Sequence, residues 1–146
     1  MSESKFILLA EDNPDDELLT LRAFKKNKIS NKVIVARDGT EVLNWLFRKH
    51  LRPHLILLDI KLPKLSGLEV LAKIRNHQET SLIPVILLTS SVEESDILEG
   101  YRLRTNSYIC KPTDYKIFEA MAQELHKYWL MSNIAPPSLK LSGKQG

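Results

Sequence analysis

The sequence predicts an α/β protein built on a doubly wound, five-stranded parallel sheet with five helices. Two observations lead to this fold class. Five short apolar runs alternate along the chain with five longer segments whose apolar residues recur at helical spacing. The short runs are almost continuously apolar, as expected for parallel strands that are buried on both faces of a sheet.

The elements follow one another in regular alternation. Strands are expected at residues 6–10, 32–36, 55–58, 85–88 and 107–110. Helices are expected after each strand, beginning near residues 15, 39, 68, 91 and 114, with the last running to about residue 130. Asp15 or Asp16 can cap the first helix, and Ser91 with Glu94 three residues later has the pattern of a capping box.

Length and composition indicate one domain. A chain of 146 residues with 43% hydrophobic side chains can bury a substantial core. We expect this domain to span residues 1–131, and residues 132–146, which contain two prolines and no acid, to form a flexible tail. The single cysteine, Cys110, excludes an intrachain disulfide, and its predicted strand position indicates an inert, buried thiol.

Other features exclude some classes of protein. No apolar stretch approaches the roughly 20 residues of a membrane-spanning helix, and the N-terminus lacks signal-peptide order, so we expect a cytoplasmic protein. The net charge of +3 includes nine lysines and arginines between residues 22 and 52. These bases are spread over several elements without a recognition helix, which favours a solvated face or an acidic partner over nucleic acid. The four histidines show no metal-ligand spacing.

Polar residues follow the apolar runs, at the point where each predicted strand ends. Glu11 and Asp12 follow the first run and Asp59 follows the third; the other two such residues are Thr89 and Lys111. Doubly wound sheets bind ligands at the carboxyl ends of their strands, where strand order reverses. Three carboxylates, a hydroxyl and an ammonium are therefore expected to meet at one edge of the sheet.

This set of residues has a definite chemistry. Three close carboxylates need a compensating cation, and hard oxygen ligands favour Mg²⁺. Without that charge, their repulsion should raise the pKa of at least one carboxyl group. The alternative role of these acids, as helix caps and turn formers, explains Asp15 or Asp16 but not a cluster at strand ends together with a lysine.

The same segments carry a family resemblance. The chain resembles a response-regulator receiver domain of two-component signalling over roughly residues 5–130, which implies a flavodoxin-like fold with the strand order 2-1-3-4-5. The matching segments are Leu9–Asp12, Asp59–Gly67, Leu88–Ser90 and Tyr108–Pro112. The separations of 30 residues from Asp59 to Thr89 and 22 from Thr89 to Lys111 also suit that family.

The resemblance implies a role for each residue. Asp59 accepts a phosphoryl group from a sensor histidine kinase, so the chain is a phosphoacceptor signalling protein that assists its own phosphorylation and dephosphorylation. Glu11, Asp12, Asp59 and the backbone carbonyl of Lys61 hold Mg²⁺. Lys111 and Thr89 contact phosphoryl oxygens, and the Lys111–Pro112 peptide is expected to be cis.

The resemblance also implies a switch. Thr89 moves towards the phosphoryl group and Tyr108 swings inward behind it, which changes the surface of the fourth helix, fifth strand and fifth helix. Tyr108 as an ordinary half-buried strand residue remains an alternative. The Lys61 side chain either shields the acyl phosphate or points to solvent.

Features outside the site suggest the partners. The Glu11–Asp16 stretch, the segment 45–48 and the long C-terminus are similar to single-domain response regulators of cyanobacterial phytochromes, which implies a phytochrome-type kinase and a homodimer. Phe118, Met121, Leu125 and Tyr128 form a core-facing stripe on the last helix. The surplus apolar residues of that helix either form the dimer interface or are covered by the tail; they are Ile117, Trp129, Leu130 and Met131.

An enzyme is the rival class. A phosphohydrolase of the haloacid-dehalogenase type also uses an aspartyl phosphate, but it needs a second aspartate two residues after its nucleophile. That position holds Lys61.

Overall fold

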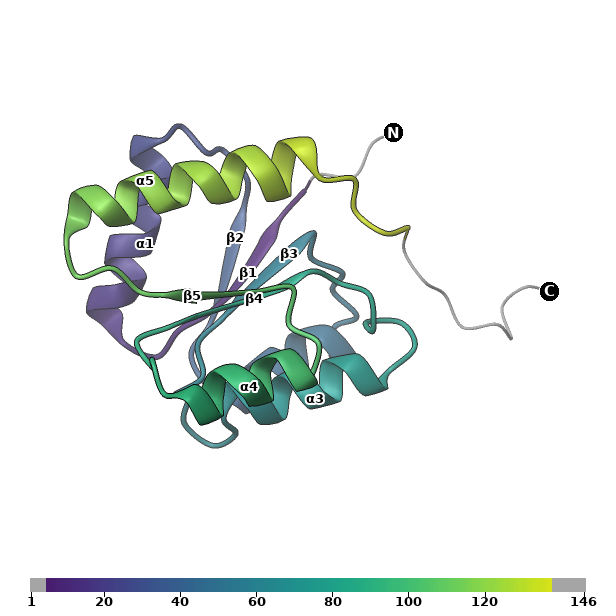
Figure 1. Ribbon diagram of the computed structural model, residues 1–146. Coiled ribbons are helices and arrows are strands. Elements are labelled where there is room, and N and C mark those ends of the chain that lie inside the picture. The colour runs from purple at the N-terminus through teal and green to yellow at the C-terminus, as the bar shows by residue number, and fades with distance from the viewer. Residues whose placement is uncertain (1–4, 138–146) are drawn as a thin grey trace.

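The computed structural model describes residues 5–137, and its sheet has the predicted architecture (Figure 1). Five parallel strands lie in the order β2-β1-β3-β4-β5. Their bounds are Ile7–Ala10 (β1), Val33–Ala36 (β2), Leu55–Leu58 (β3), Val85–Thr89 (β4) and Ser107–Cys110 (β5). The predicted fold class and strand order are therefore confirmed.

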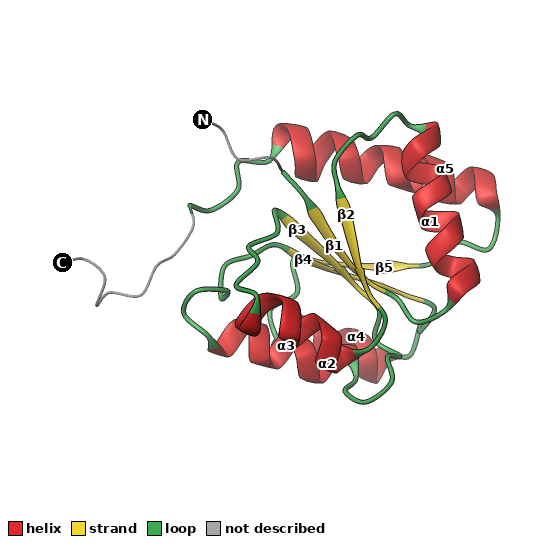
Figure 2. Cartoon of the chain, turned by 180° about the vertical axis from the view of Figure 1, so that it is seen from behind, coloured by secondary structure: helices red, strands yellow, loops and turns green. Residues whose placement is uncertain are grey.

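Helices cover both faces of the sheet (Figure 2). On one face lie α1 and α5, and on the other lie α2, α3 and α4. The α-helices span Pro14–Lys26 (α1), Gly39–Leu43 (α2), Gly67–Asn76 (α3), Glu94–Arg102 (α4) and Tyr115–Leu125 (α5). Two of them continue as π-helices, η1 (Asn44–Arg48) after α2 and η2 (His126–Ser132) after α5.

The apolar runs supply both cores because strand side chains alternate between the faces of the sheet. In β1, Leu8 and Ala10 pack into the core beneath α2 and α3, whereas Ile7 and Leu9 pack into the core beneath α1 and α5. The central strands β1, β3 and β4 are buried at every position. Burial on both faces explains why these runs lack the polar alternation of a one-sided sheet.

The edge strand β5 differs from this pattern. Its residues are half-buried or exposed, and Cys110 is exposed. The prediction that the Cys110 thiol is buried was therefore wrong. An apolar run in the sequence does not show whether its strand has neighbours on both sides. In this sheet β5 has a neighbour on one side only.

Two predicted helix caps are also corrected. The side chain of Asn13 caps α1 by accepting from the backbone N–H groups of Asp15 and Asp16, and Pro14 occupies the first turn. This is the usual pairing of an Asn cap with a proline at the first helical position. At α4 the N-cap is Glu93, which makes no side-chain cap bond.

The chain after Leu125 departs from the predicted last helix. Phe118, Met121 and Leu125 are buried as expected, but Tyr128 is 53% exposed and Leu130 is 5% exposed. A π-helix turns less per residue than an α-helix, which moves Leu130 rather than Tyr128 onto the core. The predicted tail, residues 132–146, begins inside η2, and residues 138–146 lie outside the described part of the chain.

A buried arginine, which the sequence reasoning did not single out, joins the loops beside α3. The Arg75 guanidinium donates to the backbone carbonyls of Arg104, Ser81 and Ile83 and to the side chain of Asn106. Burial and the neighbouring Arg104 lower the pKa of Arg75 to about 10. Arg75 therefore remains charged at neutral pH and connects the start of β4 with the start of β5.

No helix within residues 5–137 is long and apolar enough to cross a membrane.

Gly67 should be intolerant of substitution. A Cβ atom there would lie 2.1 Å from the Asp59 carbonyl oxygen and 2.8 Å from the Ile60 Cα, both backbone atoms that cannot move independently. We expect Gly67→Ala to lower the free energy of unfolding by about 1–3 kcal/mol, as overpacking does elsewhere.

Urea unfolding followed by circular dichroism measures this loss. Lys73→Ala, on the exposed side of the same helix, is the matched control and should stay within about 0.5 kcal/mol of wild type. Equal stability of the two variants would contradict the steric argument.

Candidate functional site

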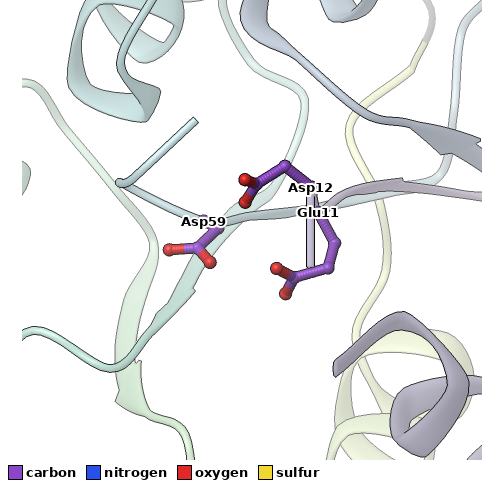
Figure 3. A group of neighbouring side chains, drawn as sticks. All are labelled: Glu11, Asp12 and Asp59. Atoms are coloured by element: carbon purple, nitrogen blue, oxygen red, sulfur yellow. The ribbon is translucent and has the colours of Figure 1, made fainter. Parts of the chain in front are cut away.

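The predicted polar residues meet at the carboxyl edge of the sheet. Glu11 follows β1 and Asp59 follows β3, and pairing of Ala10 with Leu58 brings these strand ends side by side. Glu11 is 2% exposed and Asp59 is 5% exposed, whereas Asp12 is exposed. Figure 3 shows the three carboxylates grouped where β1 and β3 end. The predicted acidic cluster is therefore present.

Backbone contacts hold Asp59, which follows β3, in place. The Asp59 N–H donates to the Ala10 carbonyl, and the Lys61 N–H donates to the Asp59 Oδ1 at 3.2 Å. The Gly67 N–H donates to the Ile60 carbonyl, which draws the start of α3 against the loop after β3. Asp59 thus has one carboxylate oxygen oriented by the loop and the other turned towards the lysine.

Lys111 is the cation of the site. Its Nζ lies 2.6 Å from Glu11 Oε1, 2.7 Å from Asp59 Oδ2 and 2.9 Å from Asp16 Oδ2. The Lys111 side chain is only 7% exposed. Hydrogen bonds run from the ammonium to Asp59 and Asp16, and Glu11 is its third close partner as an ion pair.

The predicted cis peptide at Lys111–Pro112 is corrected. No peptide bond within residues 5–137 is cis. The Lys111 N–H donates to the Thr89 carbonyl at 2.8 Å, which continues the β4–β5 pairing and sets the direction of the lysine. Because trans is the lower-energy form of an X–Pro bond and already brings the ammonium to the acids, the cis form is not needed here.

The pKa values of the site reflect its burial. Burial raises the pKa of Glu11 to about 7, although the hydrogen bond and charge of Lys111 oppose this shift. A raised carboxyl pKa is therefore confirmed, but the charge repulsion expected to cause it, here from Asp59, is a lesser cause than burial. Burial by itself would lower the pKa of Lys111, but the hydrogen bonds to Asp59, Glu11 and Asp16 raise it above its ordinary value.

The acidic cluster fits a divalent cation. Glu11, Asp12 and Asp59 each offer a carboxylate oxygen, and these oxygens lie within 4.8 Å of one another. One ammonium does not balance the charge of this cluster and Asp16 together. All-oxygen ligands with an uncompensated negative charge are suited to a hard divalent ion.

Thr89 and Tyr108 are joined through Ser91 in a hydrogen-bonded network. Thr89 is fully buried, and its Oγ1 accepts from the Ser91 N–H at 3.3 Å. The Tyr108 hydroxyl donates to the Ser91 carbonyl at 2.9 Å. The Ser91 hydroxyl donates to Asp96 of α4 at 2.5 Å, which replaces its predicted capping role. The loop after β4 therefore links Thr89, Tyr108 and α4.

The Tyr108 ring lies against α4. A Cβ atom at Gly100 would lie 3.4 Å from the ring, an ordinary contact distance, and 2.7 Å from the Leu87 side chain, so the glycine makes room for Leu87 beside the ring. Burial raises the pKa of the Tyr108 hydroxyl, and the bond to Ser91 opposes that shift.

Sequence reasoning missed one member of the site. Asp16 was interpreted as a helix cap, but its carboxylate contacts Lys111, 95 positions away. The Asn13-Pro14 pair was the available signal, because it is a stronger helix start and leaves the Asp16 side chain free.

Comparison with known proteins agrees with this geometry. Residues 7–123 match the family model of the response regulator receiver domain. Response regulator Rcp1 of Synechocystis sp. is 36% identical over 137 residues, which cover 90% of this chain and 93% of that protein.

Solved structures give the same result. The phosphorylated cyanobacterial phytochrome response regulator RcpA has a TM-score of 0.86 and 34% identity, with 92% of this chain and 100% of that chain covered. The Mn²⁺-bound form of Rcp1 has a TM-score of 0.83, 36% identity, and coverage of 91% and 99%. The bacteriophytochrome response regulator RtBRR has a TM-score of 0.72, 45% identity, and coverage of 92% and 86%.

Binding of a divalent cation should depend on pH. With the Glu11 pKa near 7, this carboxyl group holds a proton below neutral pH, and a cation must displace that proton. We expect the apparent affinity for Mg²⁺ to fall about tenfold from pH 8 to pH 6, with proton release on binding.

Calorimetric titration in buffers of different ionisation enthalpy measures both quantities. Glu11→Gln is the control, and should bind more weakly with a flatter pH profile. An affinity of the wild type that is constant over this range would contradict the assignment.

Proposed function

Because the chain belongs to the response-regulator receiver family, we propose that Asp59 accepts a phosphoryl group from a phosphohistidine of a sensor histidine kinase. A carboxylate oxygen of Asp59 forms the new P–O bond as the P–N bond to the imidazole breaks. The buried Asp59, with Lys111 beside it at 2.7 Å, is the observation that carries this proposal.

The neighbouring residues have complementary roles. Glu11, Asp12, Asp59 and the carbonyl of Lys61 would hold Mg²⁺, which would supply positive charge to offset that of the transferred group. The Lys111 ammonium donates to a phosphoryl oxygen. The Thr89 hydroxyl, at the end of the neighbouring strand, donates to another. The three-carboxylate cluster supports the metal assignment.

The output is a changed surface over α4, β5 and α5. When the Thr89 hydroxyl turns to the phosphoryl group, its contact with the Ser91 N–H is lost. The Ser91 segment also holds the Tyr108 hydroxyl and Asp96 of α4, so movement of Thr89 is transmitted to that surface. Thr89 and Tyr108 are thus the switch residues of a receiver that spans residues 1–131.

The kinase is of the phytochrome type. Two of the similar structures are a cyanobacterial phytochrome response regulator and a bacteriophytochrome response regulator, and each is matched over nearly the whole described chain. The 45% identity to the bacteriophytochrome response regulator supports a shared class of partner.

A homodimer forms through the α4-β5-α5 face. β5 is an edge strand, and exposed apolar side chains flank it on both sides: Leu98 and Tyr101 on α4 and Ile117 on α5 are 52–59% exposed. Among the surplus residues of the last helix, Leu130 instead packs into the core. Exposed apolar side chains beside an unpaired edge favour a self-association surface.

Intact-protein mass after incubation with acetyl phosphate and Mg²⁺ tests the acceptor. We expect one added phosphoryl group in wild type, none without Mg²⁺ and none in Asp59→Asn. If wild type gains no phosphoryl group from acetyl phosphate, the measurement is repeated with a phosphorylated phytochrome-type kinase as the donor. The absence of added mass with both donors would exclude phosphoryl transfer to Asp59.

Sedimentation velocity tests the dimer. Ile117→Glu and Tyr101→Glu each place a charge on the proposed face and should shift a dimer to monomer. Leu82→Glu, at a residue 50% exposed before β4, is the control and should remain dimeric. A wild type that is monomeric with and without phosphorylation at 100 μM, on the order of a weak dimer's dissociation constant, would remove the dimer from this proposal.

A further inference from the structure

Asp16 is a carboxylate that the acceptor and metal roles leave unexplained. Its Oδ2 lies 2.9 Å from Lys111 Nζ, yet Asp16 is not part of the three-carboxylate cluster. Its side chain is 33% exposed, whereas those of Glu11 and Asp59 are 2% and 7% exposed. Asp16 thus approaches the ammonium from the solvent side of the site.

The fold places Asp16 there for a local reason. Asn13 accepts from the N–H groups of Asp15 and Asp16, so the start of α1 does not need the Asp16 carboxylate as a cap. The Asp16 carbonyl accepts from the Thr20 hydroxyl, as is common within a helix. Within the described chain, the one hydrogen bond of the Asp16 carboxylate is with Lys111.

The Lys111 ammonium is engaged by three carboxylates in this arrangement. It donates hydrogen bonds to Asp59 and Asp16 and forms a close ion pair with Glu11, so donation to an incoming phosphoryl group must weaken at least one of these three contacts. A divalent cation on Glu11, Asp12 and Asp59 would weaken the hold of Glu11 and Asp59, because those carboxylates would share their charge with the cation. Asp16 lies outside that set and keeps its full charge.

On the proposed function stated above, we propose that Asp16 is a positioning residue that restrains Lys111. Asp16 competes with the phosphoryl group for the ammonium, and so slows acceptance of the phosphoryl group by Asp59. With acetyl phosphate as donor, the Asp59 oxygen forms the P–O bond while the P–O bond to acetate breaks, and acetate leaves as the anion. The restraint acts on the donation of Lys111 to the phosphoryl oxygens in that step.

The test compares the rates of Mg²⁺-dependent phosphorylation by acetyl phosphate, followed by intact-protein mass, at saturating Mg²⁺. Asp16→Asn keeps the size of the side chain and removes its charge, and should raise the maximal rate about two- to fivefold, the range for loss of one partly exposed ion pair. Asp16→Glu restores a carboxylate and should return towards the wild-type rate.

Asp15→Asn is the matched control. Asp15 is exposed on the same turn, its backbone N–H makes the same bond to Asn13, and no contact joins its side chain to Lys111 in the described chain. Asp15→Asn changes the overall charge by the same amount as Asp16→Asn but leaves Lys111 restrained. The maximal rate of this control should therefore equal that of wild type. The Mg²⁺ affinities of Asp15→Asn and Asp16→Asn, measured by calorimetry, should agree, because neither residue is a ligand.

The outcomes separate this inference from the proposed function. Suppose that wild type accepts a phosphoryl group. If the maximal rate of Asp16→Asn is then no higher than that of wild type, or if Asp15→Asn is as fast as Asp16→Asn, the restraint by Asp16 is excluded and the receiver function stands. If wild type accepts none from acetyl phosphate or from a phosphorylated kinase, the proposed function is excluded, and the inference falls with it.

Discussion

The Lys111 ammonium, buried among the carboxylates of Glu11, Asp16 and Asp59, is the interaction on which the arrangement of this molecule depends. It joins the ends of β1, β3 and β5 and the first turn of α1. Buried carboxylates without a counter-charge would be costly at the edge of an apolar sheet. Breaking such a pair on one side is expected to be far more harmful than replacing both partners, because an unpaired charge remains.

The same interaction keeps the site reactive. The single ammonium of Lys111 faces several carboxylates, so the cluster keeps a net negative charge. It therefore still attracts cations and hydrogen-bond donors. The pKa of Glu11 near 7 shows how closely the charges are balanced: burial favours the protonated carboxyl group and Lys111 opposes it. A site built in this way responds strongly to one added metal ion or one added phosphoryl group, since either changes the charge that Lys111 must balance.

The site and its surroundings are connected through short, direct contacts. Lys111 is fixed to β4 through the Thr89 carbonyl, and the next loop holds Tyr108 through the Ser91 carbonyl. Ser91 in turn is bonded to Asp96 in the first turn of α4. A change at Asp59 therefore needs to pass through only a few hydrogen bonds to reach α4. The sheet beneath the site is closely packed, because β1, β3 and β4 are fully buried. Movement is therefore expected in these few hydrogen bonds rather than in the sheet.

The sheet, its layers and the acidic edge could all be predicted from the sequence, because apolar runs that end in polar residues are local patterns and parallel strands bring their ends together. Glu11, Asp12, Asp59, Thr89 and Lys111 all follow from that rule. Tertiary structure alone decided the partners of the side chains. Asp16 reaches Lys111 rather than capping its helix, Cys110 is exposed because β5 is an edge strand, and Leu130 replaces Tyr128 in the core because η2 changes the turn of the helix. Each of these depends on contacts between residues distant in the chain or on a change of helix type, which periodicity does not encode.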